Sequence, residues 1–135
     1  MIKTMNKAHL NINEIQKIVS IDLLAVNNII IDNIGNEVPL INDLSKHILA
    51  SGGKRIRPMI TLLTSNICNY NGKNHLFLAA CIEFIHTATL LHDDVIDESK
   101  MRRGLATAND IFGNKASVLV GDFLFSRAFE IMVAN

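Results

Sequence analysis

Three carboxylates close the most apolar stretch of this chain, and their spacing suits a hard metal ion. Asp93, Asp94 and Asp97 follow residues 76–91, an apolar stretch with few polar interruptions. If the stretch is helical, the carboxylates stand at its C-terminal end, where the helix dipole opposes negative charge, and Asp93 also repels Asp94. A bound cation would compensate both effects, which makes a metal site the best explanation of the cluster.

Magnesium fits this cluster because it combines one or two carboxylates with waters and with phosphate oxygens of a substrate. On a helix, Asp93 and Asp97 lie one turn apart and about 40° from each other, and His86 shares their face two turns earlier. We therefore predict Mg²⁺ held by Asp93 and Asp97, with Asp94 beside them as a third catalytic carboxylate. The alternative, a solvated charged helix end, is disfavoured by the dipole argument.

Residues 52–58, Gly-Gly-Lys-Arg-Ile-Arg-Pro, form a basic segment at a predicted junction between helices. Glycines let the backbone approach an anion closely, and the amides at the start of the following helix favour negative charge. The segment is not a P-loop, because the spacing Gly-x-x-x-x-Gly-Lys-Ser/Thr is absent. Taken alone, it is equally compatible with a phosphate site and with an ordinary charged loop.

A second basic segment, residues 102–104, follows the carboxylates directly and contains Arg102 and Arg103. Guanidinium groups bind phosphate in a bidentate manner, although a short charged loop by itself is more often simply solvated. Together, the acidic and basic clusters indicate two anionic sites, of which one is bridged by metal on the aspartates. The other is bound directly by Lys54, Arg57, His86 and Arg103.

The elements that must position these residues are predicted to be helices throughout, because apolar residues recur three and four positions apart. The expected helices cover about residues 13–34, 40–50, 58–69, 74–97 and 114–134, with a charged loop at 98–104 and a short turn at 107–112. Asn11 or Asn13 is expected to cap the first helix, and Asn74 the fourth. No alternating strand pattern appears, so the predicted fold class is all-α.

Composition narrows the classes of function. The 135 residues suit one domain, and a formal net charge of zero gives no indication of nucleic acid or an anionic membrane as partner. Cys68 and Cys81 lack metal-type spacing and are expected to be reduced. The first residues lack the apolar core of a signal sequence, and residues 76–91 are too few for a transmembrane segment. A cytoplasmic protein is therefore expected.

Four motifs, in order, resemble those of the trans-type polyprenyl diphosphate synthases, most of all their long-chain, octaprenyl-diphosphate-synthase-like branch. They are Gly-Gly-Lys-Arg-x-Arg-Pro at 52–58, Glu-x-Ile-His-Thr-Ala-x-Leu-x-His-Asp-Asp-x-x-Asp at 83–97, Met-Arg-Arg-Gly at 101–104 and Gly-Asp-Phe-Leu at 121–124. The resemblance implies the helical bundle of the isoprenoid (terpenoid) synthases. Residues 1–135 would then form a single incomplete domain, the N-terminal half of a polyprenyl synthetase domain.

The same resemblance implies a binding site for isopentenyl diphosphate. The diphosphate of this substrate would be held by Lys54, Arg57 and His86, with Arg103 contributing. The reaction implied is the Mg²⁺-dependent condensation of isopentenyl diphosphate with an allylic prenyl diphosphate. Its product would be a long-chain all-trans polyprenyl diphosphate, a precursor of quinone side chains.

The allylic substrate is implied to bind at the acidic cluster. Asp93 and Asp97 would ligate the Mg²⁺ that bridges the allylic diphosphate, Arg102 would contact that same diphosphate, and Asp94 belongs to the motif. The cation left by the departing diphosphate would be attacked by the double bond of isopentenyl diphosphate, and a proton would then be lost. No side-chain nucleophile is required for this chemistry.

Two small residues bear on the length of the product. Ala88 and Thr89 lie about one turn before the first aspartate of the motif. In the family that the chain resembles, bulky side chains here stop a short product, so Ala88 and Thr89 imply a deep pocket and a long prenyl chain. The alternative is that both are ordinary small core residues.

The expected second half of the site is not in this sequence. Family members are more than twice as long and carry a second aspartate-rich motif, whereas no second Asp-x-x-x-Asp follows Asp97. We therefore expect the N-terminal half of such an enzyme, from a truncated or split gene and inactive alone, which acts as a homodimer or with a complementing C-terminal half. A second hypothesis is a non-catalytic accessory or remnant chain that pairs with another subunit. A third, an HD-type phosphohydrolase using His92 and Asp93, leaves both basic segments unexplained.

Overall fold

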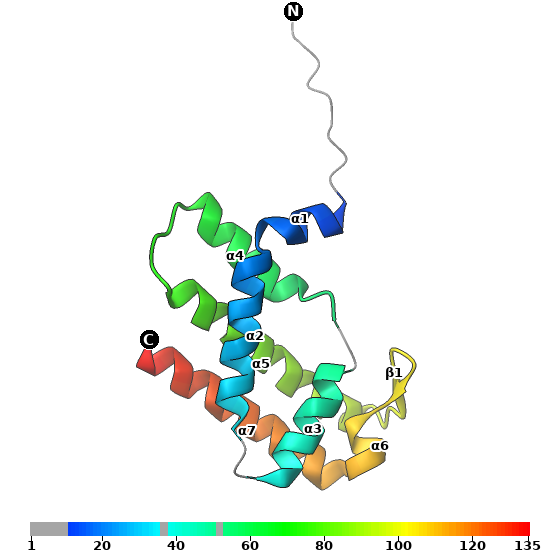
Figure 1. Cartoon of the computed structure of the whole chain (residues 1–135). Coiled ribbons are helices and arrows are strands. Elements are labelled where there is room, and N and C mark those ends of the chain that lie inside the picture. The colour runs from blue at the N-terminus through cyan, green and yellow to red at the C-terminus, as the bar shows by residue number, and fades with distance from the viewer. Residues whose placement is uncertain (1–10, 36–37, 51–52) are drawn as a thin grey trace, which may run out of the picture.

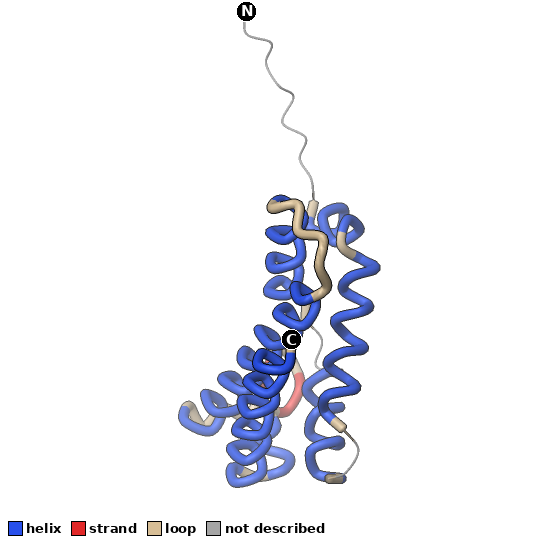
Figure 2. The backbone as a smooth tube through the Cα atoms, turned by 90° about the vertical axis from the view of Figure 1, so that its left-hand side faces the viewer, coloured by secondary structure: helices blue, strands red, loops and turns tan. Residues whose placement is uncertain are grey.

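The computed structural model describes residues 11–35, 38–50 and 53–135, which form seven helices and one small hairpin (Figure 1). The elements in chain order are α1 (Ile12–Ile18), α2 (Ser20–Ile34), α3 (Pro39–Ala50), α4 (Ile56–Ile67), α5 (Asn74–Ile96), β1 (Met101–Arg102), β2 (Leu105–Ala106), α6 (Ala108–Phe112) and α7 (Asn114–Ala134). The strands are the only extended regular structure in this described part (Figure 2). The predicted all-α fold class is therefore confirmed.

Helix α5 forms the centre of the bundle. It packs most extensively against α7 and also against α4 and α2, and Figure 1 shows α5 and α7 running side by side. Apart from Asp94, the buried side chains of α5 are small or apolar, and they lie on more than one face, which lets several helices approach it. They are Ala79, Ala80, Cys81, Phe84, Ala88, Leu91 and Asp94.

The 23 residues of α5 exceed the apolar window that the sequence suggested. By length and composition alone the helix is sufficient to cross a membrane. The core helix of a water-soluble bundle passes the same test, and α5 packs against α2, α4, α6 and α7. The length argument of the sequence analysis therefore does not hold for α5.

The continuity of the first predicted helix and the predicted cap of the fourth differ from the structure. The first predicted helix is divided at Val19, whose φ of −113° and ψ of 18° end α1 before α2 begins. Asn11 caps α1 as expected, through a reciprocal capping box with Glu14. Asn74 does not cap α5; its side-chain amide donates instead to the backbone carbonyl of Asn135, which joins the start of α5 to the end of α7.

The predicted loop at 98–104 contains a β-hairpin. Met101 pairs with Ala106 and Arg102 with Leu105, in antiparallel register. The two connecting residues have positive φ, 51° at Arg103 and 81° at Gly104, as a tight type I′ turn requires. Two-residue strands leave no alternation in the sequence, so the charged composition of the segment concealed the hairpin.

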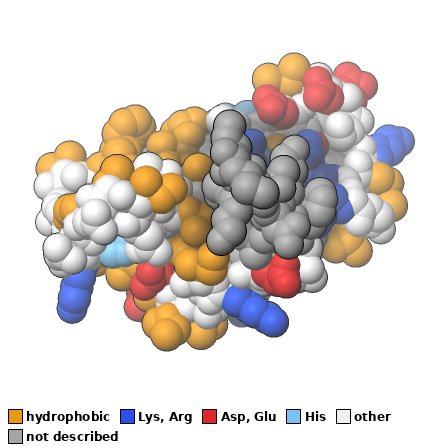
Figure 3. All heavy atoms as spheres, turned by 90° about the horizontal axis from the view of Figure 1, so that it is seen from above, with side chains coloured by type: hydrophobic (Ala, Val, Ile, Leu, Met, Phe, Trp, Pro, Cys, Tyr) orange, Lys and Arg blue, Asp and Glu red, His pale blue; other side chains and the backbone are white. Residues whose placement is uncertain are grey.

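The surface of the bundle retains many large apolar side chains, seen as orange areas in Figure 3. On α2, Ile21 is 81% exposed, and on α7 the exposed fraction of Val133 reaches 88%. Amphipathic helices of a larger bundle are expected to leave such surface uncovered when they stand alone. The exposed apolar side chains of α2 and α7 agree with that expectation.

Gly121 of α7 allows the close approach of α5. A Cβ added at this position would collide with the imidazole ring of His92, which contacts the Val118 carbonyl at 3.2 Å and the Asp122 carboxylate at 3.4 Å. Gly121→Ala is expected to destabilise the fold by about 1–3 kcal/mol, because the ring must shift. Denaturant unfolding of the purified variant measures this change.

A second variant separates the effect of the collision with His92 from the higher helix propensity of alanine. In a His92→Ala background the ring is absent, so Gly121→Ala should stabilise by about 1 kcal/mol, the ordinary gain of alanine over glycine inside a helix. A destabilisation of equal size in both backgrounds would contradict the proposed contact.

Candidate functional site

A cavity of about 490 Å³ lies where the start of α4, the middle of α5 and the turn of the hairpin meet. Basic side chains outnumber acidic ones on its walls. The walls are made by Ile48, Gly53, Lys54, Arg55, Ile56, Arg57, Glu83, His86, Thr87, Leu90 and Arg103. Four of these residues are those that the sequence grouped as a direct anion site, namely Lys54, Arg57, His86 and Arg103.

The basic segment between α3 and α4 reaches the cavity through an unusual backbone. Arg55 precedes α4 with φ 48° and ψ 37°, in the left-handed region. Lys54 and Arg57 on either side of it are exposed, whereas Pro58 is buried in the first helical turn, where its missing N–H removes no helical hydrogen bond. Gly52, the first residue of the predicted segment, lies outside the described residues.

His86 and Arg57 make the central polar contact of the cavity. The Arg57 guanidinium Nη1 lies 3.1 Å from His86 Nε2. Since arginine only donates hydrogen bonds, Nε2 must accept, and the imidazole is neutral with its proton on Nδ1. Burial lowers the pKa of His86, the charge of Arg57 lowers it further, and Glu83 opposes this shift. His86 therefore stands as a neutral acceptor among cations.

Arg103 brings the hairpin to the basic segment. Its Nη1 would lie 3.2 Å from a Cβ placed on Gly53, so the guanidinium rests against the backbone there. Two segments about fifty residues apart in the sequence thus meet at one wall of the cavity. Arg103 stands in the type I′ turn with positive φ, whereas its neighbour Arg102 belongs to β1.

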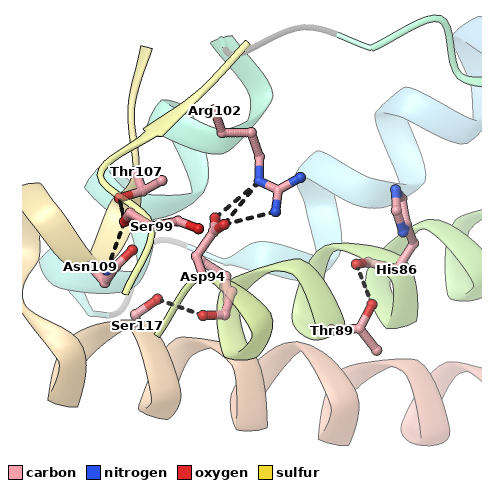
Figure 4. A network of polar contacts seen from close by, with 9 residues as sticks. His86, Thr89, Asp94, Ser99, Arg102, Thr107, Asn109 and Ser117 are labelled. Carbon is pink, nitrogen blue, oxygen red and sulfur yellow. Dashed lines mark hydrogen bonds and ion pairs between the residues drawn. The ribbon is translucent and has the colours of Figure 1, made fainter. Parts of the chain in front are cut away.

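Arg102 turns toward the acidic cluster and binds Asp94. Its Nε donates to both carboxylate oxygens at 3.1 Å, and its Nη2 donates to Oδ1 at 2.7 Å (Figure 4). Asp94 is 5% exposed. The hydrogen bond to Asp94 raises the pKa of Arg102, burial opposes it, and the charges of Asp93 and Asp97 raise it further. This pair fastens the hairpin to the end of α5.

Further hydrogen bonds fix the hairpin, and none of them was signalled by the sequence. The Ser99 carbonyl accepts from Thr107 Oγ1 at 2.6 Å and from Asn109 Nδ2 at 3.1 Å (Figure 4). From α3, His47 Nε2 lies 2.8 Å from the Ala106 carbonyl. The arginine-bearing hairpin is therefore tied to α3, α5 and α6.

Asp93 and Asp97 lie exposed at the end of α5, and Asp97 is the C-cap residue that follows Ile96. Neither carboxylate has a hydrogen bond or ion pair among the residues that the structure describes. Figure 3 shows acidic side chains gathered at one end of the molecule with basic side chains beside them. Within the same described ranges no three His, Cys, Asp or Glu side chains form a metal cluster. Two free carboxylate donors nevertheless fit Mg²⁺, which takes its other ligands from water and phosphate.

Ala88 and Thr89 occupy different environments. Ala88 is fully buried in the core, and Thr89 is half-buried with its hydroxyl donating to the His86 carbonyl at 2.7 Å (Figure 4). Their effect on product length remains a prediction.

Arg55 and Glu83 are two cavity residues to which sequence reasoning gave no role. They form an ion pair of 2.5 Å between Arg55 Nη1 and Glu83 Oε1. Glu83 is the sequence feature that could have indicated this pair, because a carboxylate inside an apolar helical stretch needs a partner.

Comparisons with known proteins agree on one relationship. Residues 38–135 match the family described as "Polyprenyl synthetase". The octaprenyl diphosphate synthase of Escherichia coli (strain K12) is 54% identical over 125 residues, which are 93% of this chain and 39% of that protein. The chain therefore spans about two fifths of the length of this relative.

Solved structures share the fold at high similarity. A decaprenyl diphosphate synthase from Rhodobacter capsulatus superposes with a TM-score of 0.89 at 47% identity, over 92% of this chain and 38% of that one. A polyprenyl synthase from Caulobacter crescentus CB15, complexed with calcium and isoprenyl diphosphate, gives a TM-score of 0.88 at 45% identity over the same shares.

Proposed function

We propose, from the premise that this chain belongs to the polyprenyl synthetase family, that it forms one side of a trans-prenyltransferase site. The reaction is the condensation of isopentenyl diphosphate with an allylic diphosphate, which yields a long-chain all-trans polyprenyl diphosphate. Residues 1–135 would contribute the N-terminal part of the synthetase domain. The observation that carries the proposal is the basic cavity next to the two unpaired carboxylates of α5.

The charges of the cavity suit a diphosphate. Lys54, Arg57 and Arg103 supply positive charge on its walls, while the charge of Arg55 is balanced by Glu83. A neutral His86 can reorient to donate a hydrogen bond to a phosphate oxygen. Arginine side chains bind such oxygens in pairs, which favours a diphosphate over a single carboxylate.

The two proposed anion sites are neighbours along α5. His86 and Asp93 lie on one face two turns apart, or about 10 Å at the rise of an α-helix. A substrate held at Lys54, Arg57 and His86 and another held at Asp93 and Asp97 would thus be brought together, which removes much of the entropic barrier to their reaction.

The aspartates are proposed to hold Mg²⁺. When bound, this ion supplies stabilisation of the negative charge on a departing diphosphate. The allylic C–O bond breaks with its electron pair on the diphosphate, the double bond of isopentenyl diphosphate forms the new C–C bond, and a proton is released. Arg102, held in place by Asp94, adds positive charge beside Asp93 and Asp97.

Several finer properties belong to the same proposal. The E. coli relative is an octaprenyl diphosphate synthase, and with the small side chains of Ala88 and Thr89 this supports a long product for this chain. A cytoplasmic location, and action as a homodimer or with a complementing C-terminal half, are also proposed.

The assay measures incorporation of isopentenyl diphosphate into farnesyl diphosphate with Mg²⁺. The chain is tested alone and together with the separately expressed C-terminal remainder of the E. coli relative. Prenyl extension only in the combined reaction supports the proposal, and no extension in either reaction contradicts it. A Lys54→Ala/Arg57→Ala variant that complements as well as the natural chain would favour the accessory alternative.

The pH dependence of diphosphate binding follows from His86. Burial and Arg57 lower the pKa of His86 in the free chain, so the neutral form contributes stability above the ordinary histidine pKa, and that stability is lost as the pH falls through the lowered value. A bound diphosphate would raise the pKa of His86 again. Binding is therefore expected to strengthen as the pH falls from 8 toward 6, with uptake of a proton.

Calorimetry in buffers of different ionisation enthalpy measures the proton uptake, and His86→Asn provides the control. The variant should bind diphosphate with less pH dependence than the natural chain. An unchanged pH dependence in this variant would contradict the role of His86.

A further inference from the structure

We infer that Arg55 and Glu83 form a positioning pair, which holds the backbone of residues 53–57 in the shape that presents Lys54 and Arg57 to the cavity. The inference rests on the proposed diphosphate site and adds two residues to it. Neither residue is placed in contact with a reacting atom. Their action is exerted through the geometry of the two cations on either side of Arg55.

The backbone at Arg55 is in a conformation that its own residue type disfavours. Its φ of 48° lies in the left-handed region, where the Cβ of an L-residue crowds the backbone. Arg55 also occupies the N-cap position of α4 without any side-chain hydrogen bond to the helix start. A strained residue of this kind persists only where surrounding contacts hold it.

The contact that can hold it is the ion pair with Glu83. Arg55 Nη1 and Glu83 Oε1 are 2.5 Å apart, and the two side chains are only 22% and 13% exposed. Glu83 projects from α5, a rigid central helix. The side chain of Arg55 is thereby drawn inward, while Lys54 and Arg57 remain exposed and turned to the cavity.

A second layer lies behind the pair. Arg55, Glu83 and Ser45 line a small cavity of about 20 Å³, which is large enough for one water molecule. The Ser45 hydroxyl of α3 is buried and finds no protein partner among the described residues. The pair therefore lies between the basic cavity and this small, mostly apolar cavity, to which Ser45 contributes from α3.

Removing the charge of Glu83 tests the inference, because a positioning role and a purely electrostatic role predict opposite changes in diphosphate affinity. The pair is neutral as a unit, so removing the Glu83 charge leaves Arg55 uncompensated and makes the cavity more positive. If the pair acted only through electrostatic potential, Glu83→Gln would bind a diphosphate more tightly. If it positions the backbone, the same substitution releases Arg55 and weakens binding.

Two double variants keep the net charge of the natural pair. Arg55→Gly/Glu83→Gln and Arg55→Ala/Glu83→Gln both lack the ion pair, and they differ from each other only in the Cβ at position 55. Glycine adopts positive φ readily, whereas alanine does not. The glycine variant is expected to bind diphosphate within about threefold of the natural chain, and the alanine variant about tenfold more weakly.

The experiment titrates each chain with isopentenyl diphosphate by calorimetry and records the backbone NMR signals of residues 53–57. Glu83→Gln should weaken binding about tenfold and shift the Cα and Cβ signals of Arg55 away from left-handed values. Thermal unfolding shows whether each variant remains folded. Tighter binding by Glu83→Gln, or equal binding by the glycine and alanine double variants, would overturn the inference.

The NMR signals distinguish failure of the proposed diphosphate site from failure of the positioning pair. If the natural chain bound no diphosphate, the proposed function would fail, and the signals of Arg55 would still show whether Glu83→Gln releases its backbone. If the natural chain bound and Glu83→Gln left the signals of residues 53–57 unchanged, the positioning pair alone would fail.

Discussion

Replacing both Asp93 and Asp97 with asparagine is expected to abolish prenyl transfer, by about a thousandfold or more. Both carboxylates are exposed on the last turn of α5, so the fold should be preserved while the oxygen donors for Mg²⁺ lose their charge. The measurement is the initial rate in the reaction that combines the chain with the C-terminal remainder of the E. coli relative, over a range of Mg²⁺ concentrations.

A neighbouring carboxylate provides the matched control. Glu98 is exposed directly after the motif, and Glu98→Gln removes one negative charge from the same surface with an expected effect below about threefold. Binding of isopentenyl diphosphate at the cavity should change little in both variants. A loss of rate as large in Glu98→Gln as in the double variant would contradict the assignment of the metal to Asp93 and Asp97.

Replacing Arg57 with alanine is expected to weaken binding of isopentenyl diphosphate by about a hundredfold. Arg57 lines the cavity and holds His86 through the contact of 3.1 Å, so the variant loses charge-assisted hydrogen bonds to phosphate and the orientation of the imidazole. Arg57→Lys should recover only part of the affinity, because an ammonium group lacks the planar fork of the guanidinium. Calorimetric titration of the two variants measures both effects.

A substitution of an exposed cation outside the cavity shows whether the loss of diphosphate affinity is specific to Arg57. Lys46 of α3 is exposed and is not part of the cavity wall, so Lys46→Ala removes the same net charge with an expected change below about twofold. Similar weakening by Lys46→Ala and Arg57→Ala would indicate that only overall charge attracts the diphosphate.

Much of the fold was predictable because its signals are local. Apolar spacing and the prolines at 39 and 58 located α3 to α5 and α7 to within a few residues. The division of the first helix at Val19 was not predictable, because the apolar pattern continues through the break. The hairpin was missed because register in two-residue strands is set by the turn and by contacts from α3 and α5.

In the candidate site, too, the features that depend on local spacing were predictable, and those that depend on helix packing were not. Motif spacing grouped Lys54, Arg57, His86 and Arg103, and the structure places these four around one cavity. Their functional roles remain predictions. The pairing of Arg55 with Glu83 depends on how α4 docks on α5, and no spacing rule along the chain contains that geometry.

The pairing of Asp94 with Arg102 is also tertiary in origin. The sequence assigned the metal to Asp93 and Asp97 and placed Asp94 beside them without a partner. In the structure Asp94 is buried and bound by Arg102, and the other two carboxylates are exposed. The reason is the direction of each side chain on the last turn of α5, since adjacent residues on a helix point about 100° apart. The roles proposed for Asp94 and Arg102 in catalysis therefore include holding the hairpin.

The cavity between α4, α5 and the hairpin is proposed to bind the diphosphate of isopentenyl diphosphate. The most direct test is a titration of the isotopically labelled chain with this substrate, followed by NMR of the backbone and of the arginine and histidine side chains. Binding at this cavity predicts saturable shifts concentrated at Lys54, Arg57, His86 and Arg103, the residues that line the cavity. Shifts that are absent there, or that cluster on a different surface of the bundle, would contradict it.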